Sequence, residues 1–328
     1  MTNKGKYREL CKKERDIPIF SKDWWMDAVC GKDNWDVVLI EKDGKIIASL
    51  PYFKKKKYGF VIITMPPLTQ NFKLWIKYPA NQKYNKKLYF ENKIISELID
   101  KLPKFDMFNL YFHYSLTNWL PFYWKNFKQT TRYTYIIEDL KNIESVFSNF
   151  SRSKKREIKR AEKVVSITDN FTLEDCYKTN ELTFQRQNLK IPFSFKLLKD
   201  IDIVCKENNC RKLIFAADKE NNIHTTLYYI YDDISVMCLI GGSDPKLRDS
   251  SANSLIHFEA MKFAHKNDLI YNFEGSMMQG VENFFRGFGA IQKPYFSITK
   301  INSKALQLLN LFVENSVFIK NIVKKIIN

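Results

Sequence analysis

Residues 212–242 read KLIFAADKENNIHTTLYYIYDDISVMCLIGG, in which three apolar runs are separated by two short polar turns. The first turn, 219–222, contains two asparagines, which tolerate the positive φ angles of tight hairpins. This pattern predicts three strands joined by short turns. A helical segment over 252–265 and a strand-like run over 269–274 follow them along the chain.

An earlier part of the chain repeats this order. Residues 37–53 form two apolar runs around the turn 42–45 (KDGK), and a third run, FVIITMPPL, occupies 60–68. Between them lies KKKKYG, which we expect at a hairpin tip rather than in a binding patch. Residues 85–102 have apolar side chains at helical spacing and 105–112 read FDMFNLYF. We therefore interpret the chain as a duplicated strand–strand–strand–helix–strand unit, an α+β (α/β) organisation.

Composition restricts the class of protein. With 328 residues, of which 45% are hydrophobic and 15% aromatic, the chain can bury a large core, so disorder is excluded as its main state. The net charge of +17 favours anionic partners such as nucleic acid, phosphorylated substrates or a membrane surface, although coding bias is an alternative explanation. No apolar run reaches the roughly 18 residues of a transmembrane helix, and residues 1–16 do not resemble a signal peptide.

The cysteines and histidines carry no recognisable metal or redox motif. The six cysteines are scattered without a CxxC pair, which indicates a reducing compartment, and we expect a cytoplasmic protein. The four histidines have no spacing that pairs them, so we expect no metal site.

The boundary between the two units is expected near 140–151. A strand-like run over 133–137 ends there, and a helical segment over 143–163 follows. Ser151 or Ser153 could cap its basic stretch, 151–163. This stretch carries seven Lys or Arg against two Glu, which indicates either a solvated helix or a surface for phosphates. We predict domains at 1–145 and 146–301 and an amphipathic C-terminal helix within 302–328. This helix packs on the body or, alternatively, lies on a membrane.

A candidate phosphate-binding segment follows the strand 235–240. Residues 241–253 read GGSDPKLRDSSAN and lead into a helix, whose first backbone N–H groups attract anions. The alternative is that its serines and asparagine serve only as helix caps. The candidate donor- or phosphate-binding residues are Gly241, Gly242, Arg248, Ser250, Ser251 and Asn253.

Two further residues are candidates for catalysis. Glu274 closes an apolar strand, where a carboxylate with a raised pKa could act as a general base on an amine. Arg286 lies in a glycine-containing turn between Phe285 and Phe288, and could stabilise a developing oxyanion. The alternatives are local capping or pairing for Glu274 and a surface salt bridge for Arg286.

The order of these features resembles a known family. The repeat, the basic helix and the segments 117–140 (TNWLPFYWKNFKQTTRYTYIIEDL) and 273–289 (FEGSMMQGVENFFRGFG) resemble tandem-GNAT acyltransferases over about residues 20–300. The most similar kinds are Fem-like peptidoglycan aminoacyltransferases and BioF2-like GNAT N-acetyltransferases. The resemblance implies two tandem GNAT-like domains, each a mixed, mostly antiparallel sheet flanked by helices.

The resemblance also implies roles for particular residues. Phe285–Gly289 matches the Fem pattern, with Arg286 in place of a lysine, so charge stabilisation is kept while proton relay is not expected. In the CoA-binding pattern Arg/Gln-x-x-Gly-x-Gly/Ala, Arg248 is present but Ser251 and Asn253 replace the small residues. The donor is therefore acyl-CoA or aminoacyl-tRNA, a co-substrate rather than a permanently bound cofactor. Acceptor-binding candidates are Arg186, Gln187, Asp244, Ser276, Phe285, Gln70, His113, Trp119 and Arg132.

These expectations combine into one function and one alternative. The first is an N-acyltransferase that transfers an acetyl, acyl or aminoacyl group to an amine of a peptidoglycan or polysaccharide precursor. Its partners would be a phosphorylated or nucleotide- or lipid-linked envelope precursor and possibly tRNA, with peripheral membrane association and without DNA. The alternative is a non-catalytic tRNA-binding protein on a degenerate GNAT pair.

Overall fold

The computed structural model describes residues 1–313, with side chains through residue 308. The chain divides into two compact units, one made of Met1–Arg132 and Pro294–Asn328 and the other of Tyr133–Lys293. The division therefore falls at 132/133 and again at 293/294, whereas the sequence analysis placed domain limits at 145/146 and 301/302. Strands β6 (Lys128–Ile137) and β12 (Ile291–Ile301) each run across one of these divisions.

The first unit is a mixed sheet with helices. Its strands follow the order β1-β2-β3-β5-β12, with the short β4 beside β2. All these pairings are antiparallel except that of β3 with β5. The elements are α1 (Asn3–Lys13), η1 (Ile19–Ser21), α2 (Asp23–Cys30), β1 (Trp35–Lys42), β2 (Lys45–Lys57), β3 (Phe60–Thr64), β4 (Trp75–Ile76), α3 (Tyr84–Asp100), β5 (Met107–Tyr111) and α4 (Leu120–Trp124).

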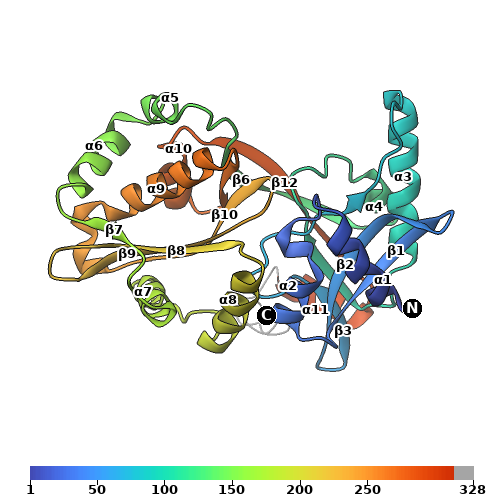
Figure 1. Ribbon diagram of the computed structural model, residues 1–328. Helices are drawn as coiled ribbons and strands as arrows, with labels where there is room; N and C mark the ends of the chain where they lie inside the picture. The colour runs from blue at the N-terminus through green and yellow to red at the C-terminus, as the bar shows by residue number, and fades with distance from the viewer. Residues whose placement is uncertain (314–328) are drawn as a thin grey trace. The chain divides into compact units, whose positions relative to one another are not determined.

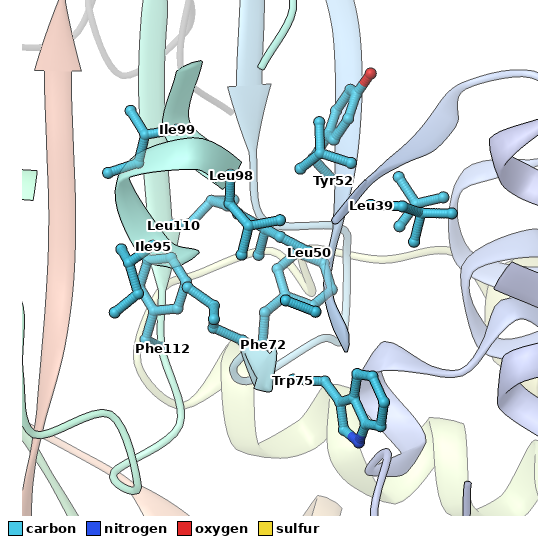
Figure 2. Packing of buried hydrophobic residues seen from close by; sticks show 14 of the residues in the cluster. Leu39, Leu50, Tyr52, Phe72, Trp75, Ile95, Leu98, Ile99, Leu110 and Phe112 are labelled. Atoms are coloured by element: carbon cyan, nitrogen blue, oxygen red, sulfur yellow. The ribbon is translucent and has the colours of Figure 1, made fainter. Parts of the chain in front are cut away.

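The apolar stripe of α3 forms the centre of the first unit's core. Ile95 and Leu98 are fully buried beside Leu110 of β5 and Phe112, which directly follows this strand (Figure 2). Complete burial of such a side chain contributes on the order of 2 kcal/mol through the hydrophobic effect. The helical spacing predicted for 85–102 is therefore confirmed, and this packing fixes α3 against one face of the sheet.

The second unit repeats the same order of elements. Its sheet runs β6-β11-β10-β9-β8-β7, and only β10 and β11 are parallel. Helices α6, α9 and α10 cover one face and α7 and α8 the other (Figure 1). The elements are α5 (Ile143–Ser148), α6 (Arg152–Ala161), β7 (Ser166–Thr168), α7 (Leu173–Gln185), α8 (Phe195–Glu207), β8 (Arg211–Ala217), β9 (Ile223–Tyr231), β10 (Ser235–Ser243), η2 (Pro245–Ser250), α9 (Ala252–Lys266), β11 (Ile270–Gly275) and α10 (Gln279–Arg286).

The predicted repeat is confirmed. The series β1, β2, β3, α3, β5 in the first unit corresponds to β8, β9, β10, α9, β11 in the second. Helix α9 is apolar on most sides, and Leu255, Ile256 and Met261 are all buried, as its composition indicates. The fold class predicted from the sequence, a mixed and mostly antiparallel sheet flanked by helices in each half, is therefore correct.

Two local predictions differ from the structure. Lys54–Lys57 belong to strand β2 and pair with β3, so the turn consists only of Tyr58 and Gly59, which both have positive φ. The expected loop at 241–253 is also shorter, because β10 continues through Gly241 and Gly242 to Ser243. In both cases the backbone pairing extends a strand into residues whose composition alone is typical of a turn.

The C-terminal helix is described only in part. Helix α11 spans Lys304–Val313, and its Leu306 packs against Ile62 and Met107 of the first unit. The packing alternative is therefore observed for this residue, and the rest of the predicted amphipathic segment, from 314, lies outside the described residues. Within residues 1–313, no helix combines the length and the apolar composition needed to cross a membrane.

Candidate functional site

Strands β10 and β11 separate along their length. Their parallel pairing is confined to Ser235–Met237 against Ile270–Asn272, although β10 continues to Ser243 and β11 to Gly275. Beyond the paired residues, β10 contains an irregularity between Cys238 and Ile240 opposite β9. Such a bulge bends a strand and redirects its side chains. An opening between two parallel strands therefore begins directly after Asn272.

Glu274 lies at this opening. It has φ 65°, a left-handed backbone conformation that is uncommon for a residue other than glycine. Asn272 holds it twice: its Oδ1 accepts from the Glu274 N–H (2.9 Å), and its Nδ2 donates to Glu274 Oε1 (3.0 Å). Thr134 Oγ1 donates to the same Asn272 Oδ1 (2.8 Å), which fixes the amide. Glu274 is therefore oriented by its neighbours, not by an ion pair.

Burial controls the protonation of Glu274. The residue is only 6% exposed, and desolvation raises the pKa of its carboxyl from 4.5 to about 8. A carboxyl with this pKa is mostly protonated at neutral pH and becomes a comparatively strong base once ionised. It can therefore exchange a proton with an amine in the pH range where amine acceptors react.

A second group of polar side chains is buried around the same strands. Tyr271 Oη lies 2.7 Å from His257 Nδ1 and 3.1 Å from Cys238 Sγ. Burial lowers the pKa of His257 to about 3 and raises that of Cys238 to about 12, so both side chains are neutral at physiological pH. The sequence analysis did not identify this group, because no spacing along the chain connects a strand cysteine with a helix histidine.

One of the two glycines of the predicted donor site, Gly242, has a packing role. Gly241 and Gly242 pair with Leu227 and Thr226 of β9. A Cβ on Gly242 would lie 2.5 Å from Asn180 Cα in α7, a distance that no packed structure accommodates. Asn180 Nδ2 donates to the Gly241 carbonyl (2.6 Å). Gly242 therefore permits the close approach of α7 to β10.

The first turn of α9 is already filled by side chains. Ser250 is buried, and its Oγ lies 2.9 Å from His224 Nδ1 and accepts from the Ala252 N–H (3.3 Å). Ser251, with φ 61°, accepts a hydrogen bond from Arg160 of α6. Asn253 Oδ1 accepts from Thr225 Oγ1 (3.4 Å). The three predicted polar residues are thus brought together, but each has a partner within the protein.

Helix α6 packs on this turn through its inner side. Lys154 is buried, and its Nζ donates to Glu157 Oε2 (2.6 Å) and to Ser254 Oγ (3.2 Å). The same ammonium lies 4.0 Å from the centre of the Phe284 ring. Ser151 caps the helix by accepting from the Lys154 N–H (3.3 Å), as one of the two predicted alternatives. Part of the basic segment is therefore structural.

The outer side of the same segment is free to contact anions. Three exposed cations of α6 are spaced four and three residues apart, which places them on one helical face, and a fourth exposed cation lies in the turn that follows the helix. The 3-10 helix η2 packs against α6 and adds two exposed cations, one of which is the predicted Arg248. We define the cationic surface as Arg152, Arg156, Lys159, Lys163, Lys246 and Arg248.

Arg286 ends α10 instead of lying in a turn. Its Nε donates to Glu282 Oε1 (2.9 Å) and its Nη2 to Asn283 Oδ1 (2.5 Å), and its side chain is 68% exposed. No hydrogen bond joins it to Glu274 among the described residues. Phe285 is buried, whereas Ser276, after β11, accepts from the Met278 N–H (3.1 Å). The two residues predicted for catalysis are therefore not in direct contact.

The segment after Arg286 is held by α6 and by Ser151, the residue directly before this helix. Ser151 N–H donates to the Gly287 carbonyl (2.9 Å), and a Cβ on Gly287 would lie 2.9 Å from Lys154 Cγ. Gly289 has φ 71°, which favours glycine. The glycines of the Fem-like segment thus allow α10 and α6 to pack closely.

Three acceptor candidates of the second unit gather at one end of α7. Helix α7 ends at Gln185, where Arg186 is its C-cap and Gln187 Nε2 donates to the Thr183 carbonyl (3.2 Å). Thr183 Oγ1 accepts from the Ser243 N–H (3.0 Å) directly before Asp244, which caps η2. Arg186, Gln187 and Asp244 therefore flank a contact between α7 and the end of β10.

The other acceptor candidates belong to the first unit. Gln70 follows β3, and Trp119 packs partly on the core with its ring 5.4 Å from that of Tyr123. Burial, with a smaller contribution from Lys73, lowers the pKa of His113 to about 4. Arg132 Nε donates to Tyr295 Oη (3.1 Å). Of these, Arg132 is the charged side chain best placed for an anion.

Comparison with known proteins identifies the fold. No protein-family model matches the sequence, and no curated protein matches it significantly. The crystal structure of FemX aligns over 94% of this chain and 98% of its own, with TM-score 0.67 and 13% identity. L-PGS from Bacillus licheniformis gives TM-score 0.55 and 9% identity over 94% of each chain. A tandem GNAT protein from the clavulanic acid biosynthesis pathway gives 0.51 and 7% over 92% and 95%. The chain therefore has a Fem-like tandem GNAT fold.

Proposed function

We propose that this protein is an N-acyltransferase in which an amine attacks an ester or thioester carbonyl directly. The observation that carries the proposal is Glu274, a buried carboxyl with a raised pKa at the opening between β10 and β11. The fold it shares with FemX, L-PGS and a tandem GNAT protein is consistent with transferase chemistry. The finer assignments below are proposals built on these residues.

In the proposed reaction Glu274 acts as the general base. Its carboxylate accepts a proton as the amine nitrogen forms a bond to the carbonyl carbon, and the carbon–oxygen or carbon–sulfur bond then breaks. The leaving oxygen or sulfur takes that proton from Glu274, so the carboxylate is regenerated at the end of the cycle. Backbone N–H groups on the separated part of β10 would stabilise the intermediate oxyanion. Arg286 would contribute positive charge near the site if it released Glu282.

Among the two donors we favour aminoacyl-tRNA over acyl-CoA. A CoA diphosphate needs the N–H groups and open space at the start of α9, where Ser250 and Ser251 already bond to His224 and Arg160. The cationic surface instead offers several exposed charges on one face, which suits the phosphodiester backbone of RNA. Gly242 would then serve the packing of α7, Gly241 the pairing with β9 and Asn253 the hydrogen bond with Thr225, rather than donor binding.

The acceptor is proposed to be an amine of a phosphorylated or nucleotide- or lipid-linked envelope precursor, met in the cytoplasm. In the second unit the candidates for contact with the acceptor are Arg186, Gln187, Asp244 and Ser276, whereas Phe285 is buried against Tyr135 and Phe273. In the first unit Gln70, His113, Trp119 and Arg132 are separate candidates, and each set is proposed for its own unit. The domain limits predicted from the sequence and peripheral membrane association stay predictions.

A transfer assay tests this function. The purified protein is incubated with bulk tRNA charged with labelled amino acids, or with labelled acetyl-CoA, and with amino sugar nucleotides or lysine-containing muropeptides. We expect label in the acceptor with charged tRNA, and a loss of about a hundredfold or more with Glu274→Gln, the range typical of a general base. Glu220→Gln, a single glutamate change in the exposed turn between β8 and β9 of the same unit, is the matched control and should retain most activity.

The outcomes separate the two candidate functions. Transfer from charged tRNA that is unaffected by Glu274→Gln contradicts the role of Glu274. Salt-sensitive tRNA binding without transfer to any of these acceptors, and equal in wild type and Glu274→Gln, favours the non-catalytic tRNA-binding protein. Transfer from acetyl-CoA alone overturns the choice of donor.

A further inference from the structure

The first unit contains an opening equivalent to that of the second. Strands β3 and β5 are parallel, and their pairing ends at Thr64 opposite Asn109, just as that of β10 and β11 ends at Met237 opposite Asn272. The two asparagines are thus equivalent in register. Two residues further along, Tyr111 of β5 occupies the place of Glu274 in β11.

After Asn109, the backbone of β5 forms its hydrogen bonds with groups outside β3. Tyr111 N–H donates to Met65 Sδ (3.2 Å), and the Tyr111 carbonyl accepts from the Phe72 N–H (2.8 Å). Phe72 then pairs with Phe112 in place of β3. The residues between Thr64 and Phe72 therefore leave the sheet. Beside Tyr111, the hydrogen-bonding edge of β5 is no longer paired with β3.

The sheet face opposite the core is polar only in part. Phe108 and Leu110 of β5, and Phe112 directly after it, belong to the core, so the alternating residues Met107, Asn109 and Tyr111 lie on the opposite face. Met107 packs there against Ile62 and Leu306, whereas Asn109 and Tyr111 are polar. Asn109 Oδ1 is buried and has no hydrogen-bond partner among the described residues. Buried polar atoms are nearly always satisfied, so this acceptor marks a place where a donor, either a water molecule or an O–H group of a ligand, completes the structure.

Arg132 covers this face. Its guanidinium carbon lies 5.1 Å from the centre of the Tyr111 ring, and its Nε donates to Tyr295 Oη (3.1 Å). None of the ion pairs found between described side chains involves Arg132, which is half-buried. Its guanidinium stacks on one tyrosine ring and donates to the hydroxyl of another, and such a planar set of donors matches the geometry of an oxyanion.

We propose that Arg132, Tyr111 and Tyr295 form an oxyanion-binding site in the first unit, which takes a carboxylate or phosphoryl group. The site differs from the opening in the second unit because it has an arginine over a tyrosine where the second unit has a buried glutamate. The oxyanion would belong to a ligand held by the first unit, and the site is argued from this unit alone. Binding itself requires no transfer.

Anion titration of the full-length protein tests the site. Tyrosine rings are labelled with ¹³C, their signals are assigned with Tyr111→Phe and Tyr295→Phe, and inorganic phosphate or acetate is added at constant ionic strength. We expect a saturable shift of both signals with at least one anion. Arg132→Gln should abolish it, and Arg132→Lys, which keeps the charge without the fork, should weaken it about tenfold.

A control variant and the results that contradict the proposal complete the test. Arg15→Gln removes an exposed arginine elsewhere in the same unit and should leave the titration unchanged. Saturation with phosphate alone or acetate alone supports the site and distinguishes the two ligand sources. No saturable shift with either anion, or the same shift in Arg132→Gln, overturns the proposal. Loss of transfer activity in Glu274→Gln with intact anion binding leaves this inference standing.

Discussion

At the residue scale, Glu274 combines a strained backbone with a buried carboxyl. Its left-handed φ and its pKa of about 8 both cost stability, and Asn272 and Thr134 hold it in place. The sequence predicted a raised pKa because the carboxyl ends an apolar strand. The asparagine clamp could not be predicted, because an i, i+2 contact on one strand requires the irregular backbone that follows Asn272.

The pKa of Glu274 makes unfolding free energy depend on pH. Its pKa is about 8 in the folded protein against 4.5 when exposed, so between these values only the unfolded state loses the proton. This group therefore stabilises the fold fully below pH 4.5, and its contribution falls by about 1.4 kcal/mol per pH unit up to pH 8. Glu274→Gln does not titrate and should lack this slope.

Urea unfolding of both proteins at a series of pH values between 5 and 8 measures the difference. The free energy of unfolding of Glu274→Gln minus that of the wild type should increase steadily as pH rises. Parallel curves for the two proteins would mean that the carboxyl titrates normally in the fold. Transfer activity, if it depends on the ionised carboxylate, should rise over the same interval.

At the element scale, the sequence predicted which segments form strands and helices better than where they end. Hairpin turns and helical periodicity placed β8, β9, β10, α3 and α9, because alternation and spacing depend on local burial. The extension of β10 through Gly241 and Gly242 depends on pairing with β9 and on the approach of α7. Neither contact leaves a local signal, and the two glycines were therefore assigned to a loop.

The packing of α7 on β10 gives a direct test of this reassignment. Gly242→Ala places a methyl group 2.5 Å from Asn180 Cα, so α7 must shift, and overpacking of this kind costs about 1–3 kcal/mol. Gly241→Ala is a matched control, since its nearest atom is Leu227 Cδ1 at 3.6 Å. Denaturant unfolding should show a clear loss for Gly242→Ala and little change for Gly241→Ala. Equal effects would contradict the packing role.

At the scale of the whole molecule, the basic residues that give the net charge of +17 do not all serve the same purpose. Lys154 and Arg160 of the basic segment are used in the packing of α6 on α9, whereas the cationic surface has no such task. The composition indicated an anionic partner but could not separate these two sets, since they alternate along one helix. The separation matters because only the outer set can change polyanion affinity without changing the fold.

Charge reversal on the cationic surface tests whether it binds RNA. Arg156→Glu with Lys159→Glu should weaken binding of bulk tRNA and reduce the dependence of its affinity on salt by roughly one power of salt concentration per lost phosphate contact. Lys190→Glu with Lys199→Glu makes the same change in net charge at exposed lysines elsewhere in the second unit. Filter binding at several salt concentrations measures both. If the two double variants lose affinity equally, net charge and not this surface attracts the RNA; an unchanged melting temperature in both confirms that folding is not the cause.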